Sequence, residues 1–277
     1  VNLQRDIVPD EPYHLAVSQA FSETWGLPEE VATARSIGVN IRRNPTLAYW
    51  IYGRALNLLE LVRPDASPWQ TLVYFRLVNV SFSIGTVIFT YLFSKELIQQ
   101  KWWSLLPVFA LTNTLMFVLL SGGVSYDNLT NLLSITGLFF LLRVLKQKDF
   151  LLNSLGWLIF ISLGALAKET ILPLALAMFV VWVVFIIKHR SDIHLNPFQS
   201  FWSTSLMVLL SLVVIANLAL YGLNLLQHGS LTPSCEDCYT KEFCDNTPFA
   251  QRREHLALED EPNLFQAFRR GYPEPIR

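Results

Sequence analysis

The middle of the chain is a series of long apolar runs separated by short polar or charged clusters. Six runs between residues 72 and 227 approach the ~20 residues with which a helix crosses ~30 Å of hydrocarbon. They lie near residues 74–94, 102–121, 128–145, 151–167, 170–187 and 203–226. As one helix, the stretch 151–187 would be roughly 55 Å long, too long for one crossing, so we place a break at Lys168 and Glu169. The pattern predicts an all-α fold, a polytopic bundle of about six transmembrane helices over residues 72–227.

Lysine and arginine are distributed unevenly among the short loops of this bundle. The loops after the first, third and fifth spans hold seven of them: Lys95, Lys101, Arg143, Lys146, Lys148, Lys188 and Arg190. The short loops on the other side, 122–127 and 168–169, contain Lys168 alone. Because an excess of positive charge in short loops marks the cytoplasmic side, residues 1–71 and 228–277 are predicted to form extracytoplasmic regions.

Residues 44–63 are predicted to form an amphipathic helix. Asn44 suits the N-cap and Pro45 the first helical position. The apolar residues recur at helical spacing: Leu47, Trp50, Ile51, Ala55, Leu58, Leu59 and Val62. Because a membrane span follows closely, we expect this helix to lie on the outer membrane surface, with Trp50 and Tyr52 at headgroup level. A helix in a soluble core is the alternative.

Composition agrees with a membrane protein. The 277 residues are 52% hydrophobic and 16% charged, against roughly 25% charged in an ordinary soluble domain. The net charge of -1 gives no basic excess, so no nucleic-acid partner is expected, and membrane lipid is the expected surrounding. The chain begins at Val1 without a signal peptide, and we expect flanking segments at both ends.

The cysteines are clustered in residues 228–277. They are Cys235, Cys238 and Cys244. This clustering favours a disulfide within the region, in an oxidising compartment, with the pairing left open. A zinc site is the alternative, although only His228 and His255 are near enough in the sequence to add ligands.

The densest group of chemically active side chains is the acidic pair Asp10 and Glu11, with His14 three residues further on. Such a group suits a general base, or a divalent metal ion held by carboxylate oxygens. The alternative is a solvated acidic turn between Pro9 and Pro12.

Five short segments together resemble a known superfamily. Pro-Asp-Glu-Pro-Tyr-His-Leu at 9–15 resembles the Asp-Glu motif in the first outside loop of GT-C glycosyltransferases, and is closest to bacterial membrane proteins grouped with them. The segment 44–49 is similar to their His-Pro-Pro-Leu-Tyr-Tyr stretch, although the histidine and second proline are absent. The other three are Arg-Leu-Val-Asn at 76–79, Ser-Tyr-Asp at 125–127, and the Gly-Leu-x-x-Lys turn within 164–170. The resemblance covers about residues 9–190, the amino-terminal half of such an enzyme without its first span.

This resemblance implies an inverting transferase in a bacterial plasma membrane. It would move a sugar from a polyprenyl-phosphate carrier to a glycan, lipid or protein acceptor on the outer face. The family's essential aspartate corresponds to Asp10, and Glu11 is the lesser catalytic candidate. No cofactor follows from the motifs, and a divalent metal ion stays open.

Physical reasoning adds candidates for binding the substrate and its phosphate. A sugar on a lipid phosphate reacts at headgroup level, where an outside carboxylate can take the acceptor proton and cations can hold the departing phosphate. Lys168 and Arg76 lie at span ends and suit this role, although interfacial snorkelling explains them too. His14 and Asp127 complete the set, and Asp127 is also expected to be the N-cap of the third span.

Two other functions are open. A transporter would carry ionisable groups at mid-membrane, whereas those of this chain lie at span ends. A non-catalytic membrane scaffold would have the same hydropathy without a catalytic loop.

Overall fold

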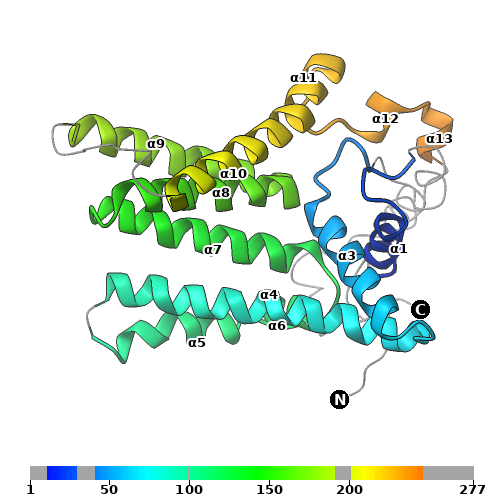
Figure 1. Ribbon diagram of the computed structural model, residues 1–277, viewed down its shortest axis with the longest axis horizontal. Coiled ribbons are helices and arrows are strands. Elements are labelled where there is room, and N and C mark those ends of the chain that lie inside the picture. Colours follow the sequence, from blue (N-terminus) through cyan, green and yellow to red (C-terminus); the bar gives the residue numbers. More distant parts are fainter. Residues whose placement is uncertain (1–10, 30–40, 99, 191–200, 246–277) are drawn as a thin grey trace, which may run out of the picture.

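The computed structural model describes residues 11–29, 41–98, 100–190 and 201–245, and these ranges contain helices and no strand (Figure 1). The helices of the amino-terminal half are α1 Glu11–Ser22, α3 Leu47–Val62, α4 Pro68–Leu97, α5 Leu106–Thr112, α6 Leu115–Gly122 and α7 Tyr126–Leu145. They are followed by α8 Phe150–Ala167, α9 Leu172–Lys188, α10 Phe201–Asn217, α11 Leu223–His228, α12 Cys235–Cys238 and α13 Lys241–Asp245. Short 3-10 turns precede α5 and α9, and a π turn, Leu218–Gly222, joins α10 to α11.

Five helical stretches are long and apolar enough to cross a membrane. They are Pro68–Leu97, Tyr126–Leu145, Phe150–Ala167, Glu169–Lys188 and Phe201–His228. The stretches Trp103–Thr112 and Leu115–Gly122 pass the same test together but are bent by 63°. The predicted all-α helical bundle is therefore confirmed.

The predicted second span, 102–121, is a bent pair and not one straight helix. The bend lies at Asn113 and Thr114, whose side chains hydrogen-bond to carbonyls of the turn before them, Asn113 to Phe109 and Thr114 to Ala110. Such bonds give the backbone an alternative to the regular helix, and Thr114 takes up an extended conformation.

The break between the fourth and fifth spans lies where it was predicted. Lys168 has extended dihedral angles of -158° and 134°, and α9 begins shortly after it with Pro173 in its first turn. Proline is tolerated there because the first N–H groups of a helix have no partner within it. The break puts Lys168 and Glu169 at one end of the bundle.

In the bundle, α7 lies between α4 and α8, and α10 packs along α8 (Figure 1). We call α1, α3, α12 and α13 the helical cap. The cap gathers at the end where α4 and α7 begin and α8 ends, which we call the cap end (Figure 1). At the opposite end, Glu96 of α4 pairs with Lys146 and Lys148, at 3.4 and 2.9 Å, so two of the loops predicted to be cytoplasmic lie together.

Helix α3 forms as predicted, but its start was predicted wrongly. It begins at Leu47 after Thr46, not with Asn44 as cap and Pro45 as first helical residue. The buried residues are Ala48, Tyr49, Tyr52, Gly53 and Leu56, whereas Leu58 and Val62 of the predicted stripe are exposed.

The reason for this orientation is close packing of α1 and α4 against the face of α3 that carries small and aromatic residues. A Cβ added at Gly53 would lie only 2.8 Å from the backbone carbonyl carbon of Phe21 in α1, so glycine permits the approach. Tyr52 and Phe75 of α4 lie edge to face, with ring centroids 5.8 Å apart. Contact of α3 with the membrane surface stays a prediction.

Candidate functional site

Two ion pairs at the cap end contact residues 123–125, which we call the α6–α7 loop. The first joins Glu11, which begins α1, to Arg76 in the third turn of α4. The second joins Asp127, in the first turn of α7, to Lys168 at the break between α8 and α9. The pairs are 65 and 41 residues apart in the sequence, so only the fold brings each together.

The Glu11–Arg76 pair is buried and bidentate. Arg76 donates from Nε to Oε1 at 3.0 Å and from Nη2 to Oε2 at 2.6 Å, and the Val124 N–H donates to Oε1 at 3.0 Å. The two side chains are only 2% and 8% exposed, for Glu11 and Arg76 respectively. Because each charge would be left unpaired without the other, the pair fastens α1 to α4 and to the α6–α7 loop.

The Asp127–Lys168 pair is partly open to solvent. Lys168 Nζ lies 2.5 Å from Asp127 Oδ1 and 4.5 Å from the centre of the Tyr126 ring, and the side chains are 20% and 29% exposed, for Lys168 and Asp127. Burial alone would lower the pKa of Lys168, but the hydrogen bond and charge of Asp127 outweigh it and raise that pKa. Lys168 is therefore a stable cation within reach of a ligand.

Ser125, and not Asp127, is the N-cap of α7. The Asp127 N–H donates to Ser125 Oγ at 3.1 Å, and Ser125 Oγ in turn donates to Asp127 Oδ2 at 3.0 Å. The predicted capping role of Asp127 was therefore wrong by two residues. Its carboxylate is instead available to Lys168, and it still complements the positive end of the helix dipole.

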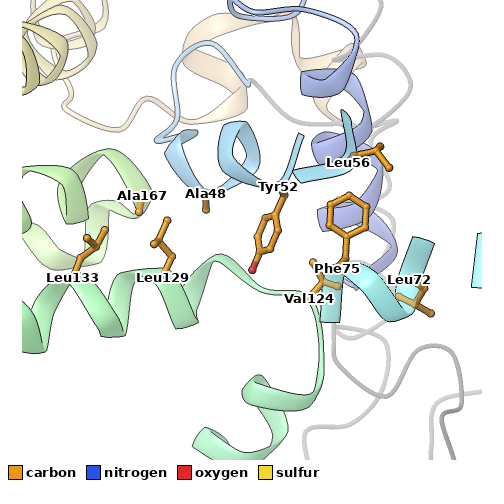
Figure 2. Close-up of a cluster of buried hydrophobic side chains, with 9 residues drawn as sticks. All are labelled: Ala48, Tyr52, Leu56, Leu72, Phe75, Val124, Leu129, Leu133 and Ala167. Carbon is orange, nitrogen blue, oxygen red and sulfur yellow. The ribbon is translucent and has the colours of Figure 1, made fainter. Parts of the chain in front are cut away.

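A buried polar network holds the α6–α7 loop in place. The Tyr52 hydroxyl lies 2.5 Å from Asn79 Oδ1 and 3.0 Å from the Ser125 carbonyl oxygen. Asn79 Nδ2 donates to the carbonyls of Leu120, at 2.8 Å, and of Gly123. Figure 2 shows Tyr52 reaching from α3 between Ala48 and Phe75 toward the segment that leads into α7. Burial, followed by the nearby charge of Asp127, raises the pKa of Tyr52 and keeps its hydroxyl protonated.

An aromatic cluster connects α1 to Lys168. His14 Nδ1 lies 2.9 Å from the Tyr49 hydroxyl, and the His14 ring meets the Tyr126 ring edge to face at 4.9 Å. Tyr13 and Tyr49 lie edge to face at 6.2 Å. His14 is only 6% exposed, so its contacts are those of a packed residue between the cap and Tyr126.

The structure thus gathers five of the six residues proposed from the sequence around one short loop. Asp10 lies outside the described residues. Sequence reasoning did not assign Tyr52, Asn79, Ser125 or Tyr126 to the site. The available signal was Asn79, the amide side chain within the predicted first span, 74–94. Within the described ranges, no three His, Cys, Asp or Glu side chains come together as metal ligands.

The carboxyl-terminal part of the cap contains a disulfide between Cys235 and Cys244, with Cys238 outside it. The preceding helix is joined to the amino-terminal region by Asn224, whose Nδ2 donates to the carbonyls of Arg43 and Leu231 at 2.8 and 3.0 Å. These contacts bring both ends of the described chain to the cap end.

Comparison of the chain with protein-family models, with curated proteins and with solved structures gave no match. The fold and the site therefore define the class: a helical bundle with span-length apolar helices and a polar, aromatic site at the end that carries the helical cap.

Proposed function

We propose that the protein is an inverting membrane glycosyltransferase. It moves a sugar from a polyprenyl-phosphate carrier to a glycan, lipid or protein acceptor at the outer membrane surface. The observation that supports this most is the position of Lys168, a partly exposed cation at the end of two span-length apolar helices. A lipid phosphate lies at the level where apolar helices end, so the two charges can meet there.

The two cations that sequence reasoning treated alike have different roles in this proposal. The Arg76 guanidinium is buried and occupied by Glu11, so Arg76 is a positioning residue. Lys168 is held by one carboxylate that solvent also reaches, so an incoming phosphate can replace Asp127 as its partner. We assign to Lys168 the departing phosphate, and to Asp127 the task of holding the lysine in place before the donor binds.

The general base in this proposal is Asp10, the chain neighbour of Glu11. Its carboxylate takes the proton of the acceptor hydroxyl, and the acceptor oxygen forms a bond to the anomeric carbon. The bond from that carbon to the phosphate oxygen breaks on the opposite face of the sugar, and the polyprenyl phosphate leaves as an anion beside Lys168. The configuration of the anomeric carbon is inverted.

The test is transfer of labelled sugar from a polyprenyl-phosphate hexose by the whole protein in nanodiscs, with cell-envelope extract as acceptor. Replacing Lys168 with glutamine should slow transfer by about a hundredfold or more, as removal of one stabilising group of a developing anion does. Asp10→Asn should also lose about a hundredfold or more, with donor binding retained. Lys148→Gln is the matched control, because this lysine is also paired with a carboxylate but lies at the opposite end.

Normal transfer by Lys168→Gln or by Asp10→Asn would contradict the assigned roles. Wild-type protein that binds no polyprenyl-phosphate sugar would contradict the transferase proposal as a whole and favour a scaffold.

A further inference from the structure

A cavity of ≈ 550 Å³ lies between α1 and the beginning of α4. One wall is a face of α1 with Glu11, Leu15 and Gln19 four residues apart, and the opposite wall includes Thr71 and Leu72. This volume is within the range of roughly 300–1,000 Å³ that is typical of small-molecule sites. The proposed reaction as described so far assigns nothing to this cavity.

The described polar side chains of the cavity supply acceptor oxygens, together with the amide and hydroxyl donors of Gln19 and Thr71, and carry little net charge. Glu11, Gln19 and Thr71 supply them, and the charge of Glu11 is balanced by Arg76 behind it. None of the described side chains that line the cavity is cationic, so it does not suit a phosphate. A carboxylate has roughly four acceptor positions, and Glu11 uses three for Arg76 and the Val124 N–H, which leaves room for a ligand hydroxyl.

Among the described residues, the rest of the wall is apolar and contains no aromatic ring. Leu15, Ala16 and Leu72 line it, together with the prolines Pro12 and Pro68. Sugars combine hydroxyl donors at their edges with C–H groups on their faces, and this combination matches acceptor oxygens placed between apolar walls. We propose that the cavity binds a neutral sugar and that this sugar is the acceptor in the transfer reaction. This inference rests on the proposed function.

The same carboxylate connects this cavity to the proposed donor site. Glu11 lines the cavity and accepts the Val124 N–H, and three residues further on Asp127 holds Lys168. Residues 124–127 therefore contact both Glu11, which lines the cavity, and Lys168, the proposed phosphate-binding lysine. A sugar in the cavity would lie beside Glu11, whose carboxylate also contacts the loop that leads to Asp127.

The experiment measures saccharide binding by saturation-transfer NMR, using the whole protein in nanodiscs without donor lipid. The probes are maltose, lactose, chitobiose and mannobiose, with inorganic phosphate and glucuronic acid as charged comparators. At least one neutral disaccharide should bind, and the charged probes should not. Ala16→Trp fills the cavity and should abolish that binding. Glu23→Trp adds the same side chain at an exposed position just after α1 and should leave it unchanged.

A second variant keeps the test valid if Ala16→Trp fails to fold. Thr71→Val keeps the shape of the side chain but removes one hydrogen bond, and should weaken saccharide binding by about three- to tenfold. The inference is overturned if no neutral disaccharide binds the wild-type protein, or if both cavity variants bind as well as the wild type.

The two proposals fail in different ways. If transfer depends on Lys168 but the KM for the acceptor is unchanged in Thr71→Val and Ala16→Trp, the acceptor cavity is overturned. The transferase proposal then stands. Saccharide binding that the cavity variants remove, in a protein that transfers no sugar, would overturn the transferase and leave a neutral-sugar site.

Discussion

The hydroxyl of Tyr52 on α3 lies 2.5 Å from the side-chain oxygen of Asn79 on α4, and both residues are fully buried. Asn79 in turn holds the carbonyls of Leu120 and Gly123. Tyr52 and Asn79 therefore connect the cap to the α6–α7 loop. Residues 123–125 lie between two helices, and the side chains of Tyr52 and Asn79 hydrogen-bond to the carbonyls of Ser125 and Gly123. Asp127 follows this loop in the first turn of α7, and Lys168 is paired with Asp127, so the loop helps to position the ion pair.

Replacing Tyr52 with phenylalanine tests this dependence. The change leaves Asn79 Oδ1 and the Ser125 carbonyl without the hydroxyl, and an unsatisfied buried polar group costs about 1–3 kcal/mol. We expect a lower unfolding temperature in detergent. Tyr74→Phe, at a half-buried position of α4, is the control and should unfold like the wild type. Equal unfolding temperatures for all three proteins would show that the network does not hold the loop.

Replacing one partner of the Glu11–Arg76 pair should lower the stability of the fold more than removing both charges. Arg76→Met leaves a buried carboxylate without its cation, which typically costs about 3–5 kcal/mol. The double variant Glu11→Gln, Arg76→Met removes both charges while keeping an acceptor for the Val124 N–H, and should recover part of that loss. Thermal unfolding of the single and double variants gives the comparison. If the double variant is less stable than Arg76→Met, the two side chains do not act mainly by neutralising each other's charge.

Close packing of α1 on α3 can be tested with two glycines. An alanine Cβ at Gly53 would lie 2.8 Å from backbone atoms of Phe21, so Gly53→Ala should push α1 away and destabilise the cap by about 1–3 kcal/mol. Gly122→Ala is the matched control, since a Cβ there meets nothing within 4 Å. Limited proteolysis of the cap should be faster in Gly53→Ala only. Equal cleavage of the two variants would mean that α1 does not rest on Gly53.

Membrane sidedness can be read from a single cysteine. The chain has three cysteines, two of them joined as Cys235–Cys244, so alkylation without reductant should modify Cys238 alone. With the cap outside, a membrane-impermeant maleimide added to intact cells should label Cys238. In a Cys238→Ser background, Lys148→Cys should react only after the membrane is opened. Labelling of Lys148→Cys in intact cells would reverse the predicted topology.

The sequence by itself determined the helical bundle and the break at Lys168. Whether a segment is long and apolar enough to cross hydrocarbon is a local property, so six runs could be found without knowing their neighbours. The break at Lys168 is local for the same reason, since two charges and Pro173 interrupt one apolar stretch. The bend within the second span was missed because the side chains at the bend, Asn113 and Thr114, also occur within helices.

The site was decided by the tertiary structure. Periodicity shows that a helix has an apolar face, but α3 has apolar or aromatic residues on more than one side, and only its contact with α1 and α4 selected the side that carries Tyr52. The charges were visible in the sequence, but their pairing was not, because Glu11 meets Arg76 and Asp127 meets Lys168 across 65 and 41 residues. Such long-range pairs form only where packing of the helices brings distant parts of the chain together, a condition that no local pattern encodes.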